Sequence, residues 1–489
     1  MVPTDYDNDY CGTMSLGKRI EFDQNQLNYA RSTNEKYTFN VYFHYIDNVV
    51  PQNEQEDKAQ DMIGVLNLYF NEADIYFKYR GYENINDASY RSISGNNVED
   101  LSSTYDIDNN INIYICENFV DNQGNPTSYT GNTWTWTNIS GDVVKKIITI
   151  RVDYIPEYNN ANPTLDELKL HTLVHEMGHY MGLYHTHQMW KYDNNGNLIT
   201  VKDTYSGCDR IEENLDNSES TIYGDLLSDT NPDRVRKRYW NGSNYYSNCT
   251  VSWNHYTGDA NCNRSIDQNM FDPPMDNIMA YYHQCRSGFS MGQYARMRAI
   301  IAQEINGGFL SGQRTTEISL YEPYEVNVEV DYDWVLSETD NGNGTTTICY
   351  GSKLVHKFQK GFDYEFYHHN GNNNYSLEYN SPKYERPIDE GPQRAVKIPA
   401  LDASLIYLYD DTAGIRPDPT ANCVTARPVG GKVITKDVNG TVIEQRNLNA
   451  SEASDPNLIQ TLENNKVHRI EKDLDNGKKS VKTIYKTQP

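Results

Sequence analysis

Positive charge and long hydrophobic runs are both scarce in this sequence. Its 489 residues include 43 Lys and Arg against 68 Asp and Glu, which gives a formal net charge of -25. Nucleic acids and anionic membranes attract basic surfaces, and this composition has no surplus of positive charge to form one. No stretch of about 18 apolar residues is present that could cross a bilayer. The two absences argue against a nucleic-acid-binding, membrane-surface or transmembrane protein.

Cysteine is scarce as well. The eight cysteines are spread over the whole chain, so they cannot form the disulfide framework of a mini-protein. They suit a few disulfides in an exported protein or reduced thiols in a cytosolic one. The first residues, Met1-Val2-Pro3-Thr4, do not begin a charged region followed by an apolar one. We therefore expect either a protein that is not exported or a mature form from which a signal peptide has been removed.

Aromatic residues, by contrast, are abundant. They make up 12% of the chain, and 40 of them are Tyr, although the mean hydropathy is only -0.78. Aromatic side chains supply buried area that offsets the entropy of ordering a chain, so the sequence predicts a folded protein. At roughly 150 residues per domain, the length predicts about three domains.

Hydrophobic periodicity predicts a mixed α/β (α+β) fold for residues 36–312. Alternating apolar residues predict a half-buried strand from Tyr37 to Tyr45, and helical spacing predicts a helix after Pro51. Further β runs are expected at residues 74–79, 111–115 and 147–152. A strand, a helix and several more strands in this order indicate a mixed sheet.

Two capping boxes predict later helices. A Thr-x-x-Glu box opens a helix expected from Leu165 to Met181, which should end at Gly182 because glycine readily adopts the left-handed conformation. A second box, from Ser290 to Gln293, opens a last helix. After residue 312 the pattern changes to Tyr and Val alternation, with hairpin signals at Asn439-Gly440 and Asn476-Gly477. Residues 313–489 are therefore expected to form a β-rich region.

A candidate zinc site lies in the segment from His175 to His185, which reads His-Glu-Met-Gly-His-Tyr-Met-Gly-Leu-Tyr-His. On a helix, His175 and His179 lie one turn apart on one face, so both imidazoles can reach one ion at about 2.0–2.1 Å. Gly182 then allows a sharp turn that brings His185 back as a third ligand. Three nitrogen ligands leave a fourth position for water, which is the arrangement of catalytic zinc sites.

Glu176 should project beside the metal without being a ligand. In this motif we expect it to take a proton from zinc-bound water, whose pKa zinc lowers to about 7, and to give it to the leaving amine. The alternative is a helix that merely contains two histidines, and the spacing of Gly182 and His185 argues against it. His171 and His187 lie nearby, and we expect them to support the site or face solvent rather than bind the metal.

This segment resembles the signature of the metzincin metallopeptidases, H-E-x-x-H-x-x-G-x-x-H followed by a methionine turn. A candidate for that turn is Asp276-Asn277-Ile278-Met279-Ala280-Tyr281. The resemblance implies a metzincin-type catalytic domain in which Met279 forms an apolar floor under the zinc ligands. It also implies that Tyr281 stabilises the oxyanion of the tetrahedral intermediate.

A narrower resemblance is to the pappalysin group within the metzincins. The segments that carry it are Asn112-Ile113-Tyr114, Gly224 to Thr230, and Phe289 to Gln293. Members of this group commonly bind calcium near the second segment, and oxygen-rich loops suit that ion. The resemblance therefore makes Asp225, Asp229 and Thr230 candidate calcium ligands.

The resemblance extends to the beginning of the chain. Cys11-Gly12-Thr13 is similar to a Cys-Gly-Thr motif in the pro-segments of bacterial pappalysins, where the thiolate occupies the open zinc position. Residues 1–35 would then be a pro-segment that keeps the enzyme latent. The alternative is a free or disulfide-bonded Cys11 in a polar arm.

The resemblance also implies disulfides around the active site. Cys285 follows the methionine turn closely and is expected to pair with an upstream cysteine, with Cys262 as the first choice and Cys249 as the second. Cys208 with Cys249 is the companion pair. Such bonds would hold the long loop region against the active site.

We therefore expect a secreted or cell-surface zinc endopeptidase that cleaves proteins or peptides. Its parts are the pro-segment (1–35), the catalytic domain (36–312) and a β-rich accessory domain (313–489), with the substrate lying along an edge strand near residues 147–152. Two alternatives remain open. In one, the β-rich region is an adhesion or glycan-binding module and the metal domain is degenerate. In the other, the zinc site hydrolyses amides or esters that are not peptides.

Overall fold

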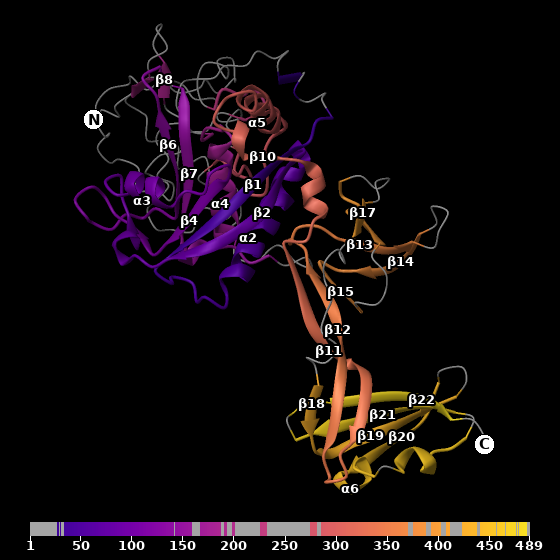
Figure 1. Ribbon diagram of the computed structural model, residues 1–489. Helices are drawn as coiled ribbons and strands as arrows, with labels where there is room; N and C mark the ends of the chain where they lie inside the picture. Colours follow the sequence, from indigo (N-terminus) through magenta and orange to yellow (C-terminus); the bar gives the residue numbers. More distant parts are fainter. Residues whose placement is uncertain are drawn as a thin grey trace, which may run out of the picture. The chain divides into compact units, whose positions relative to one another are not determined.

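The computed structural model separates the chain into two compact units (Figure 1). The first unit consists of Met1–Glu322 together with Gln359–Phe362, and the second of Pro323–Phe358 and Asp363–Pro489. The residues that the structure describes are 27–28, 30, 34–140, 142–158, 167–186, 190–192, 198–200, 225–231, 274–280, 285–369, 375–387, 393–401, 407–410, 423–437, 441–455, 457–464, 466–475, 477 and 479–486. No helix in these parts of the chain is long and apolar enough to cross a membrane.

The first unit is built on a six-stranded sheet with the strand order β10-β1-β4-β7-β6, in which β2 also pairs with β1. The pairs β1–β2, β1–β4 and β4–β7 are parallel, while β6 and β10 pair antiparallel with their neighbours. The strands are β1 (Tyr37–Ile46), β2 (Ile75–Ile85), β4 (Ile111–Cys116), β6 (Gly131–Thr137), β7 (Val143–Arg151) and β10 (Arg314–Thr315). The predicted mixed α/β architecture with a mixed sheet is confirmed.

Burial in the sheet differs from the prediction for β1. Its alternation predicts one exposed face, yet all of its residues except Asn40 and Tyr42 are buried. All residues of β4 are buried as well. Parallel strands inside a sheet are covered on both faces, so an alternating pattern of large aromatic residues does not imply a solvent-facing side here.

The expectation that residues 147–152 form an edge strand is wrong. They belong to β7 and the short turn after it, and β7 pairs with β4 on one side and with β6 on the other. Within the described residues, β6 is the strand at this edge of the sheet. The sequence does not reveal this order because β6 precedes β7 in the chain and folds back outside it as a hairpin.

Three helices support the sheet and the site. Helix α2 (Gln55–Phe70) packs against β2, helix α4 (Glu167–Tyr180) packs against β6 and β7, and the two helices contact each other. Helix α5 (Met291–Glu304) begins at the predicted capping box, in which Ser290 Oγ accepts from the N–H of Gln293 at 3.1 Å and Gln293 Oε1 accepts from the N–H of Ser290 at 2.9 Å. Smaller elements of this unit are α3 (Val98–Tyr105) and the strand pairs β3 (Ser92–Ile93) with β5 (Asn118–Phe119) and β8 (Trp190–Tyr192) with β9 (Leu198–Thr200).

The second unit is β-rich, as predicted. Its three sheets have the orders β11-β12-β15 with β18 on β12, β14-β13-β16-β17, and β20-β19-β21-β22. The strands on either side of the two Asn-Gly signals form the antiparallel pairs β19–β20 and β21–β22, whereas Asn439, Gly440 and Asn476 themselves lie outside the described residues. The elements are β11 (Glu325–Asp340), β12 (Thr346–Lys357), β13 (Glu365–His369), β14 (Tyr375–Asn380), β15 (Lys383–Pro387), β16 (Gln393–Lys397), β17 (Tyr407–Asp410), β18 (Cys423–Ala426), β19 (Pro428–Lys436), β20 (Val442–Asn449), α6 (Ala450–Ala453), β21 (Lys466–Leu474) and β22 (Lys479–Lys486).

Residues 359–362 complete the first unit from far along the chain. Gln359 is 1% exposed, and its side chain bonds the backbone of β2, accepting from the N–H of Tyr79 at 3.0 Å and donating to the carbonyl of Phe77 at 2.9 Å. Lys360 adds ion pairs with carboxylates of α2. The first unit is therefore discontinuous in sequence, which no local pattern indicates.

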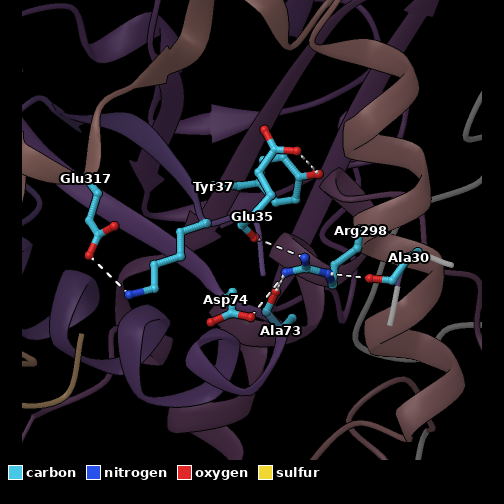
Figure 2. A network of polar contacts seen from close by, with 8 residues as sticks. Ala30, Glu35, Tyr37, Ala73, Asp74, Arg298 and Glu317 are labelled. Atoms are coloured by element: carbon cyan, nitrogen blue, oxygen red, sulfur yellow. Dashed lines mark hydrogen bonds and ion pairs between the residues drawn. The ribbon is translucent and has the colours of Figure 1, made fainter. Parts of the chain in front are cut away.

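A buried arginine of α5 holds the beginning of the described chain on the first unit (Figure 2). The Arg298 guanidinium donates to the carbonyl oxygens of Ala30 at 2.8 Å, Glu35 at 3.0 Å and Ala73 at 2.6 Å. The residue is 4% exposed, so these carbonyls replace the water that the cation loses on burial. The backbone carbonyls of Ala30 and Glu35 are thus hydrogen-bonded to the interior of this unit.

Removal of residues 1–35 should destabilise the protein more than removal of residues 1–26. The longer deletion takes away the Ala30 and Glu35 carbonyls and leaves the buried guanidinium with fewer partners, at a cost of about 1–3 kcal/mol for each group left unsatisfied. Urea denaturation of the two shortened proteins measures the difference. In an Arg298→Met background the difference should shrink, and equal stability of the two proteins with Arg298 present would contradict the role given to it.

Candidate metal centre

Three imidazole nitrogens meet at the end of α4. His175 and His179 lie one turn apart on the helix, and His185 follows its end. Their Nε2 atoms are 3.2 Å apart between His175 and His179, 3.2 Å between His175 and His185, and 3.0 Å between His179 and His185. Nitrogens bound to one tetrahedral ion at about 2.0–2.1 Å would lie about 3.3–3.4 Å apart. The three side chains are therefore close enough to bind one metal ion.

The other ring nitrogens determine which atoms face the centre. His175 Nδ1 lies 2.8 Å from the carbonyl oxygen of Ile278, and His179 Nδ1 lies 2.9 Å from that of Leu183. A carbonyl can only accept, so each Nδ1 carries the hydrogen and each Nε2 presents a lone pair. At most one hydrogen bond, donated by His185, can form among the three Nε2 atoms. Converging lone pairs repel one another, and a cation between them removes that repulsion.

All three rings are buried, and burial keeps the His179 ring in the form that binds metals. The exposed fractions are 2% for His175, 1% for His179 and 7% for His185. Burial lowers the pKa of His179 to about 3; the Leu183 carbonyl opposes this shift, and the charge of Lys146 adds to it. The His179 ring is therefore neutral at physiological pH, as a metal ligand must be.

The end of α4 is built around Gly182, as predicted. Its φ is +90°, its N–H donates to the carbonyl of His179 at 2.9 Å, and the N–H of Leu183 donates to the carbonyl of Gly178 at 2.9 Å. A Cβ at position 182 would lie 2.3 Å from Cδ1 of Ile300, so both the backbone angle and the available space require glycine. This turn leaves the Leu183 carbonyl free of the helix and available to His179.

The predicted methionine turn lies against the same helix. Met279 is fully buried, and its Sδ is 2.7 Å from the place that a Cβ on Gly178 would occupy. Asn277 Oδ1 accepts from the N–H of Met279 at 2.8 Å, and the Asn277 amide donates to Gln293 Oε1 at 2.8 Å. The turn is thus tied to the first residues of α5, which directs the Ile278 carbonyl toward the histidines.

Glu176 is completely buried beside the triad but is not one of its clustered ligand groups. The Thr133 hydroxyl of β6 lies 2.9 Å from Glu176 Oε2 and 2.7 Å from the Glu176 carbonyl oxygen. Gly131, two residues earlier on β6, leaves room for the side chain, because a Cβ there would lie 2.8 Å from Glu176 Cγ. The glutamate therefore packs between its own helix and the edge strand.

The three candidate calcium ligands lie in a short segment, Asp225 to Thr230, that contacts the beginning of α5 through Asp229. Asp225 Oδ1 accepts from the Thr230 hydroxyl at 2.7 Å, and the Asp229 carboxylate accepts from the N–H of Gly292 and from the Ser290 hydroxyl at 3.2 Å. Asp229 thus bonds the beginning of α5, and Thr230 bonds Asp225 within its own segment. Burial raises the pKa of Asp225 to about 7, and its Oδ2 has no hydrogen-bond partner among the described residues.

Other predicted site residues lie outside the described residues. They are Cys11, His187, Cys208, Cys249, Cys262 and Tyr281. Cys285 is disulfide-bonded, as expected for a cysteine that follows the methionine turn. The cysteines proposed as its partners are among those that the structure does not describe.

A second disulfide is not predicted by the sequence. Cys349 and Cys423 are bonded within the second unit, where they face each other on the antiparallel strands β12 and β18. They are 74 residues apart in sequence. Only the register of two β strands reveals the pair, and the spacing of the cysteines carries no signal for it.

His171 is not part of the triad. It is 2% exposed, and its Nε2 lies 3.0 Å from the Tyr69 hydroxyl of α2. This contact joins the two helices one turn before the first ligand. The expectation that His171 supports the site rather than binds the metal agrees with this position.

Comparison with known proteins does not assign the chain to a family. No protein-family model matches it, and no curated protein is significantly similar to it. The functional interpretation therefore depends on the geometry of the site.

Replacement of the third histidine should abolish metal binding. We expect His185→Ala to lose the bound metal, because two nitrogens hold an ion much less tightly than three, and His187→Ala to retain it. Metal analysis of the purified proteins by mass spectrometry distinguishes the two variants. Retention by His185→Ala together with loss by His187→Ala would show that the third ligand is wrongly assigned.

The stability of the metal-free protein should fall as the pH decreases below about 6.5. Burial, together with the nearby charge of Arg286, lowers the pKa of His171 to about 3, whereas an unfolded imidazole titrates near 6.5. The unfolded state therefore takes up the proton first, and the native state loses up to about 1.4 kcal/mol per pH unit for this group. His171→Gln should show a shallower loss in urea denaturation between about pH 7 and pH 5. An unchanged slope would contradict this interpretation.

Proposed function

We propose that the protein is a zinc-dependent endopeptidase of the metzincin type. The observation that carries the proposal is the convergence of three Nε2 atoms, from His175, His179 and His185, beside the buried carboxylate of Glu176. Structural zinc sites are usually closed by four protein ligands, whereas catalytic sites have three and an open position. Among the described residues the cluster has three members. This set of three nitrogen donors suits a hydrolytic zinc site better than a structural one.

In this proposal the chemistry is divided between the ion and Glu176. His175, His179 and His185 would hold the zinc, which would supply a Lewis acid for the scissile carbonyl and for the attacking water. Glu176 takes a proton from the attacking water on a carboxylate oxygen and gives it to the leaving nitrogen. Its complete burial supports this role, because a carboxylate shielded from bulk water keeps the proton within the site.

The substrate in this proposal is an extended peptide on β6. This strand ends the described sheet, and its Gly131 lies against the side chain of Glu176. Main-chain hydrogen bonds to an open strand edge are a common way to bind extended peptides. A peptide bound there would pass the glutamate, whereas β7 has strands on both sides and cannot accept one.

The remaining parts of the proposal concern location and regulation. Disulfides at Cys285 and between Cys349 and Cys423 favour a secreted or cell-surface protein, because such bonds persist in oxidising environments. Cys11 is proposed to block the centre in a latent form, and Tyr281 is proposed to stabilise the oxyanion. The Oδ2 of buried Asp225, which has no hydrogen-bond partner among the described residues, supports calcium binding in the segment from Asp225 to Thr230.

Glu176→Gln should abolish proteolysis without loss of zinc. Removal of the general base should lower the rate of casein cleavage by about 10²- to 10⁴-fold. The measurement uses protein without residues 1–26, so that the proposed latent arm is removed while Ala30 and Glu35 remain on Arg298. Zinc content and casein cleavage are compared for the two proteins.

Glu99→Gln is the matched control, since Glu99 is an exposed glutamate on α3 and should leave cleavage unchanged. Equal cleavage by the Glu176→Gln variant and the parent protein would refute the mechanism. A zinc-loaded parent protein that cleaves neither casein nor a mixed peptide library would refute the peptidase assignment and favour the binding alternative.

A further inference from the structure

The edge strand β6 contacts the proposed general base through the side chain of Thr133. Its hydroxyl is within hydrogen-bond distance of two oxygens of Glu176, the carbonyl oxygen at 2.7 Å and Oε2 at 2.9 Å. Thr133 is 2% exposed and Glu176 is 0% exposed. The single hydroxyl hydrogen of Thr133 is shared between these two acceptors in a three-centre contact, which holds the Glu176 carboxylate close to its own carbonyl group and restricts the rotation of the side chain.

The neighbouring residues of β6 reinforce this contact. Gly131 lies on the same face of the strand as Thr133, since alternate residues of a strand point to the same side. A Cβ at position 131 would come within 2.8 Å of Glu176 Cγ and 3.0 Å of Thr172 Cγ2, so the strand approaches α4 as closely as glycine permits. One residue of β6 makes room for the glutamate and the next residue on that face holds its carboxylate.

We propose that Thr133 is a positioning residue for the reaction, one that holds the Glu176 carboxylate in the orientation needed for proton transfer. The proposal rests on the proposed peptidase function. A glutamate side chain has three rotatable bonds, and a displacement of about 1 Å at a reacting group can cost about 100-fold in rate. The Thr133 contact removes that freedom from the side of the sheet at which an extended substrate would bind.

The experiment compares four proteins that all lack residues 1–26: the parent, Thr133→Val, Thr133→Ser and Thr38→Val. Valine keeps the shape of threonine without the hydroxyl, and serine keeps the hydroxyl. Thr38 is the matched control, because it is 1% exposed in β1 and its hydroxyl has no hydrogen-bond partner among the described residues. The measurements are kcat and KM on a fluorogenic peptide, zinc content and the thermal midpoint.

We expect Thr133→Val to lower kcat by about 10- to 100-fold with KM within about twofold of the parent. Thr133→Ser should restore most of kcat, and Thr38→Val should match the parent. Zinc content should be equal in all four proteins, which separates positioning from metal binding and from misfolding.

The outcomes of this experiment distinguish a failure of the positioning role from a failure of the peptidase function. If the parent cleaves the peptide and Thr133→Val keeps its kcat, or if serine is as slow as valine, the positioning role is refuted while the peptidase assignment stands. A change confined to KM would assign Thr133 to substrate binding and would also refute the proposal. If the parent itself cleaves no peptide, the proposed function fails and this inference fails with it.

Discussion

Two backbone carbonyls, those of Leu183 and Ile278, determine where the candidate metal-binding nitrogens converge. Each accepts the Nδ1–H of one histidine and so turns the lone pair of that ring toward the same point. Neither carbonyl would be available without a specific backbone turn. The Leu183 carbonyl depends on the left-handed Gly182 at the end of α4, and the Ile278 carbonyl depends on the methionine turn.

That turn in turn depends on the beginning of α5. Gln293 Oε1 accepts both from the N–H of Ser290, within the capping box, and from the amide of Asn277, within the turn. A local helix cap is thereby connected through Asn277 to the orientation of His175. The sequence indicates the capping box only as the beginning of a helix. In the folded chain its Gln293 also bonds Asn277 and so helps to position the Ile278 carbonyl.

Basic residues are scarce in this acidic chain, and three of them, Lys146, Arg296 and Arg298, are buried in the first unit, where they donate to backbone carbonyls. Lys146 of β7 donates to the carbonyl of Tyr180 at 2.8 Å, and Arg296 donates to that of Gly182 at 3.1 Å. Both carbonyls lie at the end of α4, where a helix dipole favours cations. Arg298 does the same for Ala30, Glu35 and Ala73. Buried basic side chains thus satisfy backbone groups that would otherwise lose hydrogen bonds, and two of them bond the end of the helix that carries the candidate metal ligands.

The sequence by itself determined those features whose geometry is complete within a few residues. The one-turn spacing of His175 and His179, the left-handed turn at Gly182 and the cap at Ser290 follow from local backbone rules, and the structure has them where they were expected. The β-rich character after residue 312 was also predictable from the sequence, because hairpin turns and alternation are local signals.

Only the tertiary structure decided which strand lies at the edge, which cysteines pair across β12 and β18, and how residues 359–362 and Arg298 complete the first unit. These features join residues far apart in the chain, and their partners are selected by strand register and packing rather than by propensity. The position of Glu176 belongs to the same class. Its place next to His175 follows from the motif. Its contact with Thr133 exists because β6 pairs with β7 and forms the edge of the described sheet.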